Sequence, residues 1–438
     1  MLAKDPNHQK RNKLKKSNQC MQVPIRSIGV SLACAALLSS CGLSELMNLP
    51  VVLRVARTVP SDSGAEYDDY SRMRDTLKAL TKQLQGVDDS INVQVSLYGR
   101  RNFVDEIERQ TSSGFGPDLI ITDSETSLKL YNRKLIHPIE IKPEELNNIP
   151  NYLFNLARAK DGKYVGQPVS QYVQVACYNK ETVKNPPATL QALHKSSEDH
   201  SFGLALQLKD LYWSAEAFNA EKAIEYAMQG RSPNQKETSQ FTRWLTWLKS
   251  ASYQQNIRFL SDQASLRRGL IAKELDWITC WSTNLPELRE KMKDQLGVTG
   301  LPKGPSRSLR AATRLSIWSL GKNSSQRQRE KSMVFIDFIT KPWAQKTYAL
   351  RNKQSFPVDK NGAKIVASKM PGGEAALARY EEEAMKVTAT AARTKAMVFR
   401  DPERYETISD HLLDTIYDIE TPEAATKAII KALKEDKK

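Results

Sequence analysis

The segment DLIITDSETSLKLY (residues 118–131) decides the fold, because it joins an apolar strand directly to a helix. Gly116 and Pro117 precede it and mark the turn that introduces the strand. Two more strand-like segments come earlier, VVLRVARTV (Val51–Val59) and INVQVSLYG (Ile91–Gly99), and a helical pattern follows each of them. This alternation predicts a parallel sheet whose strands are connected by right-handed crossovers.

The pattern changes after Pro150. The run KYVGQPVSQYVQVACYNK (Lys163–Lys180) has a turn and then a long extended stretch, and a second α/β region follows it. That region predicts strands at FGLALQL (Phe202–Leu208), LDWITCW (Leu275–Trp281) and ATRLSIWSL (Ala312–Leu320), with helices at 211–220, 223–228 and 239–251. A helix over 327–349, interrupted at Pro342, and a mainly helical tail from Glu374 complete the predicted order.

The amino-terminal sequence predicts an export signal. In RSIGVSLACAALLSSC (residues 26–41), one basic residue precedes a short apolar run, which falls below the roughly 20 residues that a membrane span needs. Its end, LSSC, resembles the bacterial lipobox, in which the chain is cut before the Cys and lipid is attached to the thiol. The resemblance implies lipidation at Cys41; an ordinary signal peptide or a buried helix are the alternatives. We expect translation to begin at Met21, with residues 1–20 as an upstream extension rather than a long basic signal region.

Size and charge limit the function classes. Removing residues 1–40 takes away seven basic residues and one acidic residue, which lowers the net charge from +15 to +9 over 398 residues. A chain of this length predicts two domains. The remaining charge suits an anionic surface, an anionic ligand or simple solubility, and nucleic acid is a poor partner for an exported chain.

Two cysteines remain in the body of the chain, Cys177 and Cys280, and both lie in strand-like apolar runs. An oxidising compartment allows a disulfide between them, and two separate buried thiols are the alternative.

Enzyme signatures are missing from the sequence. It contains no G-x-S-x-G elbow, Walker loop, Gly-rich dinucleotide turn or HExxH motif, and the histidines have no metal-ligand spacing. We therefore expect no catalysis, no cofactor and no metal. Aromatic residues are the more informative signal, because rings with polar neighbours suit stacking on sugar faces. Trp213, Trp281 and Trp318 stand beside polar residues at the predicted ends of elements, whereas Trp244 and Trp247 belong on a core-facing helix face.

The order of segments resembles the large sugar-binding solute-binding proteins of ABC importers, whose best-known members bind maltose. The resemblance rests on blocks that are weak singly but come in the family's order: GFGPDLIITDSETSLKLYNRKLIHPI, KYVGQPVSQYVQVACYNKETV, PPATLQAL, RRGLIAKELDWITCW, LGVTGLPKGP and KSMVFIDFITKPWAQKTYALRNKQSFPV. The block around Trp281 departs from the family, because Asp276-Trp277 stands where Ala-Met is usual; Trp277 is therefore the alternative matching ring.

The resemblance implies a two-lobed α/β clam of the periplasmic-binding-protein type, type II-like, with a mostly parallel sheet in each lobe. It places a leader at 1–40, a lipidated tether at 41–50, lobe one at 51–168 plus 306–365, lobe two at 169–305, and C-terminal helices at 366–438. Ligand-binding residues carried over from it are Tyr67, Asp68, Asp123, Ser124, Glu125, Tyr172, Trp213, Trp281 and Trp318.

The predicted function is capture of a sugar, oligosaccharide or small glycoside for an ABC permease, by a monomer anchored through lipid on the periplasmic or extracytoplasmic face of a membrane. The predicted partners are the carbohydrate, the permease subunits and the membrane, with no nucleic acid. An anionic ligand such as a sugar phosphate, or a metal ion, is the alternative within the same fold. A lipid-anchored carbohydrate hydrolase or a surface scaffold is the alternative from another class.

Overall fold

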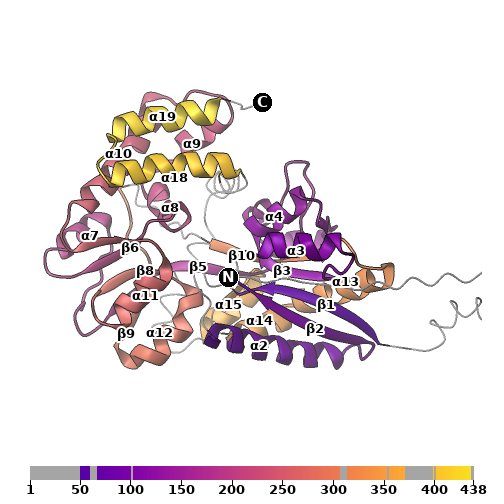
Figure 1. Ribbon diagram of the computed structural model, residues 1–438. Helices are drawn as coiled ribbons and strands as arrows, with labels where there is room; N and C mark the ends of the chain where they lie inside the picture. Colours follow the sequence, from indigo (N-terminus) through magenta and orange to yellow (C-terminus); the bar gives the residue numbers. More distant parts are fainter. Residues whose placement is uncertain are drawn as a thin grey trace, which may run out of the picture. The chain divides into compact units, whose positions relative to one another are not determined.

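A mixed sheet of eleven strands runs through the computed structural model, in the order β2-β1-β3-β10-β5-β8-β6-β7 with β4, β9 and β11 pairing beside this path (Figure 1). The structure describes residues 50–59, 67–99, 102–305, 313–352, 355–369, 398 and 401–435. Within these residues, no helix combines the length and the apolar character that crossing a membrane requires. Cys41 lies outside the described residues.

The strands and helices have the following bounds. The strands are β1 Val51–Thr58, β2 Ile91–Tyr98, β3 Leu119–Asp123, β4 Ile136–His137, β5 Gln167–Asn179, β6 Phe202–Ala205, β7 Ile257–Leu260, β8 Trp277–Trp281, β9 Leu296–Thr299, β10 Thr313–Gly321 and β11 Phe356–Pro357. The α-helices are α2 Tyr67–Gln85, α3 Phe103–Ser112, α4 Ser124–Asn132, α5 Pro143–Asn148, α6 Asn151–Leu156, α7 Leu190–Ser196, α8 Leu208–Ala217, α9 Glu221–Met228, α10 Gln235–Ser252, α11 Gln263–Ile271, α12 Leu285–Met292, α13 Gln326–Thr340, α14 Pro342–Asn352, α15 Lys360–Lys369, α18 Pro402–Ile416 and α19 Pro422–Lys434; two short 3₁₀ helices are η2 Ser282–Asn284 and η3 Lys293–Gln295.

The first part of the sheet is parallel at its centre. Strand β1 pairs in parallel with β2 and β3, and β10 joins β3 antiparallel. Alternate side chains of β1 face opposite layers: Leu53 and Val55 pack with α2 and α13, whereas Ala56 packs with α3 and α4. Both faces are therefore covered, which explains why apolar residues occupy consecutive positions such as Val55 and Ala56 rather than every second position.

The second part repeats this arrangement with different helices. Strand β6 pairs in parallel with β7 and β8, and β5 pairs antiparallel with β8. One large apolar core joins this sheet to α8, α9 and α10, and the C-terminal helices α18 and α19 add Ile408, Leu412 and Ile429 to it. Figure 1 shows α18 and α19 beside α10. The mixed α/β class predicted from the alternating segments is confirmed.

Most predicted elements form, with shifts at their ends. The interruption predicted at Pro342 is confirmed, since α13 ends at Thr340 and α14 begins at Pro342. The predicted strand 202–208 ends at Ala205, because Gln207 already precedes the first turn of α8. Asn102 stands at the start of α3, and its side chain makes no capping hydrogen bond.

A disulfide joins β5 to β8. It connects Cys177 and Cys280, whose Cα atoms lie 5.9 Å apart, and both residues are fully buried. Their strands are already adjacent, with Cys177 opposite Ile278 and Cys280 opposite Val175. Of the two states that the sequence left open, the structure therefore contains the bonded one.

Replacing both cysteines with alanine should lower the free energy of unfolding by about 2–4 kcal/mol, because the bond spans 103 residues and restricts the unfolded chain. Urea unfolding of the oxidised wild type and the double variant measures the difference. A reductant present during unfolding serves as the control: it should destabilise the wild type and leave the variant unchanged. A wild-type midpoint that the reductant does not move would contradict the disulfide.

Candidate functional site

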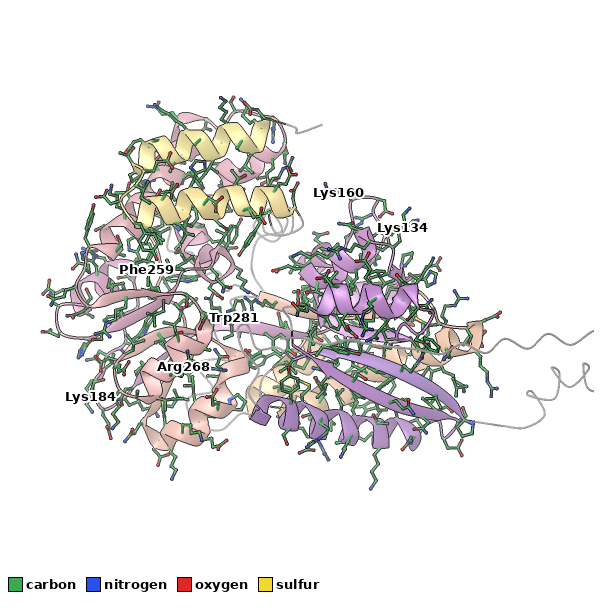
Figure 2. All side chains as sticks on the ribbon, viewed as in Figure 1. Lys134, Lys160, Lys184, Phe259, Arg268 and Trp281 are labelled. Carbon is green, nitrogen blue, oxygen red and sulfur yellow. A yellow bond between two sulfur atoms is a disulfide. The ribbon has the colours of Figure 1, made fainter. Side chains whose placement is uncertain are left out.

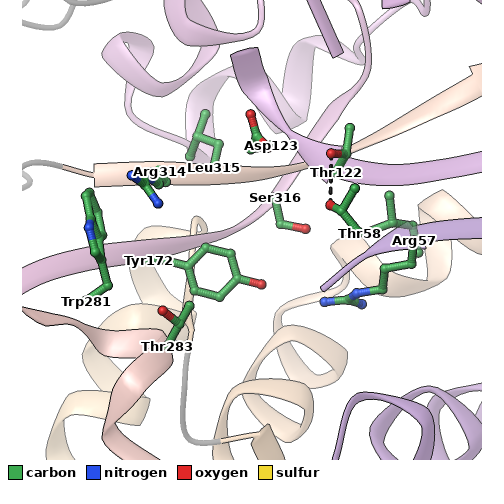
Figure 3. A pocket seen from close by; sticks show the side chains of 11 residues that line it. Arg57, Thr58, Thr122, Asp123, Tyr172, Trp281, Thr283, Arg314, Leu315 and Ser316 are labelled. Atoms are coloured by element: carbon green, nitrogen blue, oxygen red, sulfur yellow. Dashed lines mark hydrogen bonds between the residues drawn. The ribbon is translucent and has the colours of Figure 1, made fainter. Parts of the chain in front are cut away.

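A cavity of about 30 Å³ lies where the carboxyl ends of β1, β3 and β8 meet β5 and the start of β10. Open α/β sheets generally bind ligands at the carboxyl ends of their strands, so the position is the one that the fold favours. One water needs roughly 10–15 Å³ of such space, so the cavity holds a few waters and no sugar ring. Its lining residues are Arg57, Thr58, Ile121, Thr122, Asp123, Tyr172, Trp281, Thr283, Arg314, Leu315 and Ser316 (Figure 3).

Hydroxyl and carboxylate groups come from the ends of β1 and β3. Strand pairing places Arg57 opposite Ile121, so the last residues of the two strands stand side by side. The hydroxyls of Thr58 and Thr122 are hydrogen-bonded at 2.9 Å. Asp123 ends β3 and caps α4, accepting from the backbone N–H and the hydroxyl of Thr126, each at 2.9 Å. The capping bonds fix the position of this carboxylate in the cavity wall.

Arg57 contributes a buried cation. Its side chain is 1% exposed, and its Nη2 donates to the hydroxyl of Tyr348 in α14 at 2.6 Å. Burial lowers the pKa of Arg57, but the hydroxyls of Tyr348 and Tyr172 more than offset this and leave it raised. Burial raises the pKa of Tyr172 to about 12, so its hydroxyl stays protonated at neutral pH. Figure 3 shows the Arg57 guanidinium and the Tyr172 hydroxyl pointing toward one another.

A second buried network holds the opposite wall. The indole N–H of Trp281 donates to Oδ1 of Asp210 at 2.6 Å, and Nη2 of Arg314 lies 3.4 Å from the same oxygen. The Arg314 guanidinium also stacks over the Trp281 ring, 4.1 Å from its centroid. Asp210 itself is fully buried, and its backbone carbonyl accepts from the Gln174 side chain at 2.7 Å. The indole is thereby fixed in orientation beside the cavity.

The structure brings three of the predicted site residues together, because Asp123, Tyr172 and Trp281 all line the cavity. Figure 2 shows where Trp281 lies in the whole molecule. Ser124 and Glu125 begin α4 and do not line the cavity. The pKa of Tyr405 in α18 is raised to about 12, mainly by burial and next by the charge of Glu125.

Two further predicted residues have undescribed side chains. Tyr67 and Asp68 form the first turn of α2, and their side chains lie outside the described part of the chain.

Two of the predicted tryptophans lie in the core and not in the cavity wall. Trp213 is 2% exposed in the middle of α8 and packs edge-on against Trp247, with ring centroids 6.2 Å apart. Trp318 is 1% exposed in β10 and packs against Phe335 of α13, with centroids 5.0 Å apart. The sequence interpretation took their polar neighbours as the sign of an element's end, but these neighbours lie within regular elements that are covered on both sides.

The sequence interpretation missed several lining residues, and the two arginines matter most. Arg57 and Arg314 each place a charge within a largely apolar strand segment, VVLRVARTV and ATRLSIWSL, and the first segment also contains Arg54. A buried strand rarely contains a charge without a partner or a function. That irregularity was the available signal. The hydroxyls of Thr58, Thr122, Thr283 and Ser316 carry no comparable signal, since such residues are common at strand ends.

One cluster of metal-ligand type lies elsewhere. Donor atoms of His411, Asp414 and Glu420, near the end of α18, are within 4.8 Å of one another. His411 already pairs with Glu420 at 2.7 Å, and all three residues are partly exposed to water. The cluster is explained by this pairing and is not assigned as a metal centre.

The chain belongs to the family of bacterial extracellular solute-binding proteins, whose model matches residues 76–373. It is thus an extracellular binding protein by family. No curated protein matches the chain significantly.

Solved structures with the same fold include sugar-binding proteins. The GacH receptor of Streptomyces glaucescens, solved unliganded and with acarbose, is 12% identical, with a TM-score of 0.68, and the match covers 89% of this chain and 100% of that one. The maltose-binding protein MalE of Listeria monocytogenes, solved with maltose, is 15% identical (TM-score 0.63; 88% and 97% covered). A solute-binding protein of Thermotoga lettingae, solved with α-D-tagatose, is 14% identical (TM-score 0.65; 87% and 99% covered). These likenesses show the two-lobed fold.

Tyr172→Phe should reduce the alkaline loss of stability. The unfolded tyrosine ionises near pH 10, whereas folded Tyr172 keeps its proton to about pH 12, so the unfolded state releases its proton first. The stability that is present below pH 10 is therefore lost as the pH rises from 10 to 12, by about 1 kcal/mol at pH 11. Urea unfolding at pH 9 and about pH 11 measures this for the wild type, Tyr172→Phe and the exposed control Tyr417→Phe. Equal losses in all three proteins would contradict the assignment.

Proposed function

We propose that the chain is the lipid-anchored binding subunit of an ABC importer, which captures a sugar, oligosaccharide or small glycoside and delivers it to a membrane permease. The observation that carries this proposal is the cavity at the carboxyl ends of the strands, which combines an oriented indole, a phenol, hydroxyls and charged groups. The family is one of binding proteins, and structures of the same fold contain acarbose, maltose and tagatose.

The cavity chemistry suits a carbohydrate. Sugar rings present apolar C–H faces that stack on aromatic rings, and Trp281 and Tyr172 supply such rings. Sugar hydroxyls need partners that both donate and accept, and the hydroxyls of Thr58, Thr122 and Thr283 provide these. The Asp123 carboxylate adds a fixed acceptor. Such a site distinguishes between sugars that differ in the position of their hydroxyls.

Capture requires opening of the site. A cavity of about 30 Å³ excludes a sugar ring, so the ligand enters when the surrounding segments move apart and is enclosed when they return. We propose lobe one at 51–168 plus 306–365 and lobe two at 169–305, with motion about the strands that connect them. Of the tail 366–438, α18 and α19 pack with α8, α9 and α10, so they would move with lobe two.

Lipidation at Cys41 would hold the protein at a membrane surface. A lipid on this residue and the short tether to residue 50 would hold a monomeric binding protein at the periplasmic or extracytoplasmic face, close to its permease. The proposal rests on the LSSC sequence at 38–41 and on membership of an extracellular family.

Trp281→Ala should weaken binding of the captured sugar by one to two orders of magnitude, since losing a stacking aromatic at a binding hot spot costs about 1–3 kcal/mol. Calorimetric titration with a panel of oligosaccharides and glycosides identifies the ligand and measures the change in affinity. Trp213→Ala is the matched control, because it removes a buried tryptophan that lies outside the cavity wall. It should lower stability and leave the affinity within about twofold.

Two results would oppose the proposal. Equal affinity losses in folded Trp281→Ala and Trp213→Ala would remove the cavity from ligand binding. Steady release of a cleaved product from a bound glycoside would instead indicate a hydrolase.

Cys41→Ser should abolish lipid attachment and leave the leader uncleaved. Labelling with a radioactive fatty acid and mass analysis of the amino-terminal peptide measure both changes in cells. Cys34→Ser, within the apolar run, is the matched control and should change neither. A Cys41→Ser chain that still incorporates the label would contradict lipidation at this residue. Peptides from residues 1–20 in the unprocessed precursor would contradict a start at Met21.

A further inference from the structure

Arg57 is a buried cation with few hydrogen-bond partners among the described residues. Its side chain is 1% exposed, and its Nη2 donates to the Tyr348 hydroxyl at 2.6 Å. Its Nε and Nη1 are buried and have no hydrogen-bond partner within the part of the chain that the structure describes. An arginine side chain stays charged in proteins, so it cannot relieve this by losing a proton.

Other buried or half-buried arginines of the chain are compensated differently. Arg54 pairs with the fully buried Asp118 at 3.4 Å, Arg267 with Glu287 at 3.1 Å, and Arg314 with Asp210 at 3.4 Å. Among the described residues, Arg57 pairs with no carboxylate, and the groups that act on its charge are the hydroxyls of Tyr348 and Tyr172. Buried charges are normally paired, so the exception points to a partner from outside the fold.

The Arg57 guanidinium lies in the cavity wall. Arg57 shares this wall with the hydroxyls of Thr58, Tyr172 and Ser316. Asp123, the carboxylate in the same wall, is committed to capping α4 through two hydrogen bonds to Thr126. A planar guanidinium flanked by hydroxyl donors is the arrangement that binds a carboxylate or a phosphoryl group.

We propose that the captured ligand carries an anionic oxygen group, a carboxylate or a phosphate, which enters the cavity and pairs with Arg57. This rests on the proposed function and narrows it to acidic sugars or their glycosides, such as uronic acids and sugar phosphates. The cavity of about 30 Å³ accepts a group of this size even where it excludes a sugar ring. The neutral remainder of the ligand then occupies the space that opening creates on the Trp281 side.

Calorimetric titration of the full chain in detergent tests the proposal. The probes are glucuronate, galacturonate, glucose 6-phosphate and inorganic phosphate, with glucose and galactose as neutral counterparts. At least one acidic sugar should bind about tenfold or more tightly than its neutral counterpart, as a charge-assisted hydrogen bond to a buried arginine requires. Comparing the affinity for the two uronates with the affinity for glucose 6-phosphate shows whether the site prefers a carboxylate or a phosphate.

Variants assign the preference to Arg57. Arg57→Gln should abolish it, so that acidic and neutral sugars bind within about twofold of one another, whereas Arg57→Lys should retain part of it. Arg158→Gln is the matched control: Arg158 also lies 5.8 Å from a tyrosine ring, as Arg57 does, but it is exposed and outside the cavity. It should keep the full preference. The wild-type comparison needs no variant, so it decides the matter even where Arg57→Gln does not fold.

The outcomes separate this inference from the proposed function. Neutral sugars that bind as tightly as acidic ones overturn the inference and leave sugar capture intact. Binding of inorganic phosphate that depends on Arg57, with no sugar bound, supports the anion site and overturns sugar capture. If none of the anionic probes binds more tightly than its neutral counterpart, the inference is overturned. This result is expected if one of the chain's own carboxylates already neutralises Arg57.

Discussion

The pairing of β5 on both of its sides is the constraint on which the rest of the structure depends. Residues of β5 pair with β10 and β11 in one part of the sheet and with β8 and β9 in the other. A strand buried in this way must satisfy its backbone groups through neighbouring strands, because water cannot reach them. The register that results places Tyr172 opposite Arg314 and Gln174 opposite Trp281. The cavity follows from this register, since residues from distant parts of the chain meet there.

Electrostatics then distinguishes the two ends of the cavity. At one end Arg314 and Trp281 share Asp210, so the positive charge is balanced within the fold. At the other end, among the described residues, the groups that act on the Arg57 charge are the hydroxyls of Tyr348 and Tyr172. The electrostatic interactions of a buried charge are stronger than those of an exposed one because the local dielectric is low. One end is therefore complete as a structural unit, and the other has capacity for a ligand.

The sequence predicted the fold well because its signals are local. Alternating strand and helix patterns, the Gly-Pro turn before β3 and the break at Pro342 each depend on a few neighbouring residues. The site was predicted only in part. Asp123, which the family resemblance supplied, lines the cavity, but the sequence could not separate Trp213 from Trp281, since both are buried tryptophans near polar residues. Which of them faces a cavity depends on contacts between segments that are far apart in the sequence.

A crystal structure of the chain with its tightest-binding sugar would test the central claim most directly, namely that the cavity beside β5 is where the ligand binds. The account predicts electron density for the ligand in contact with Arg57, Tyr172 and Trp281, with its acidic group on the Arg57 side. Ligand density at another place, with this cavity unchanged and filled only by water, would contradict it.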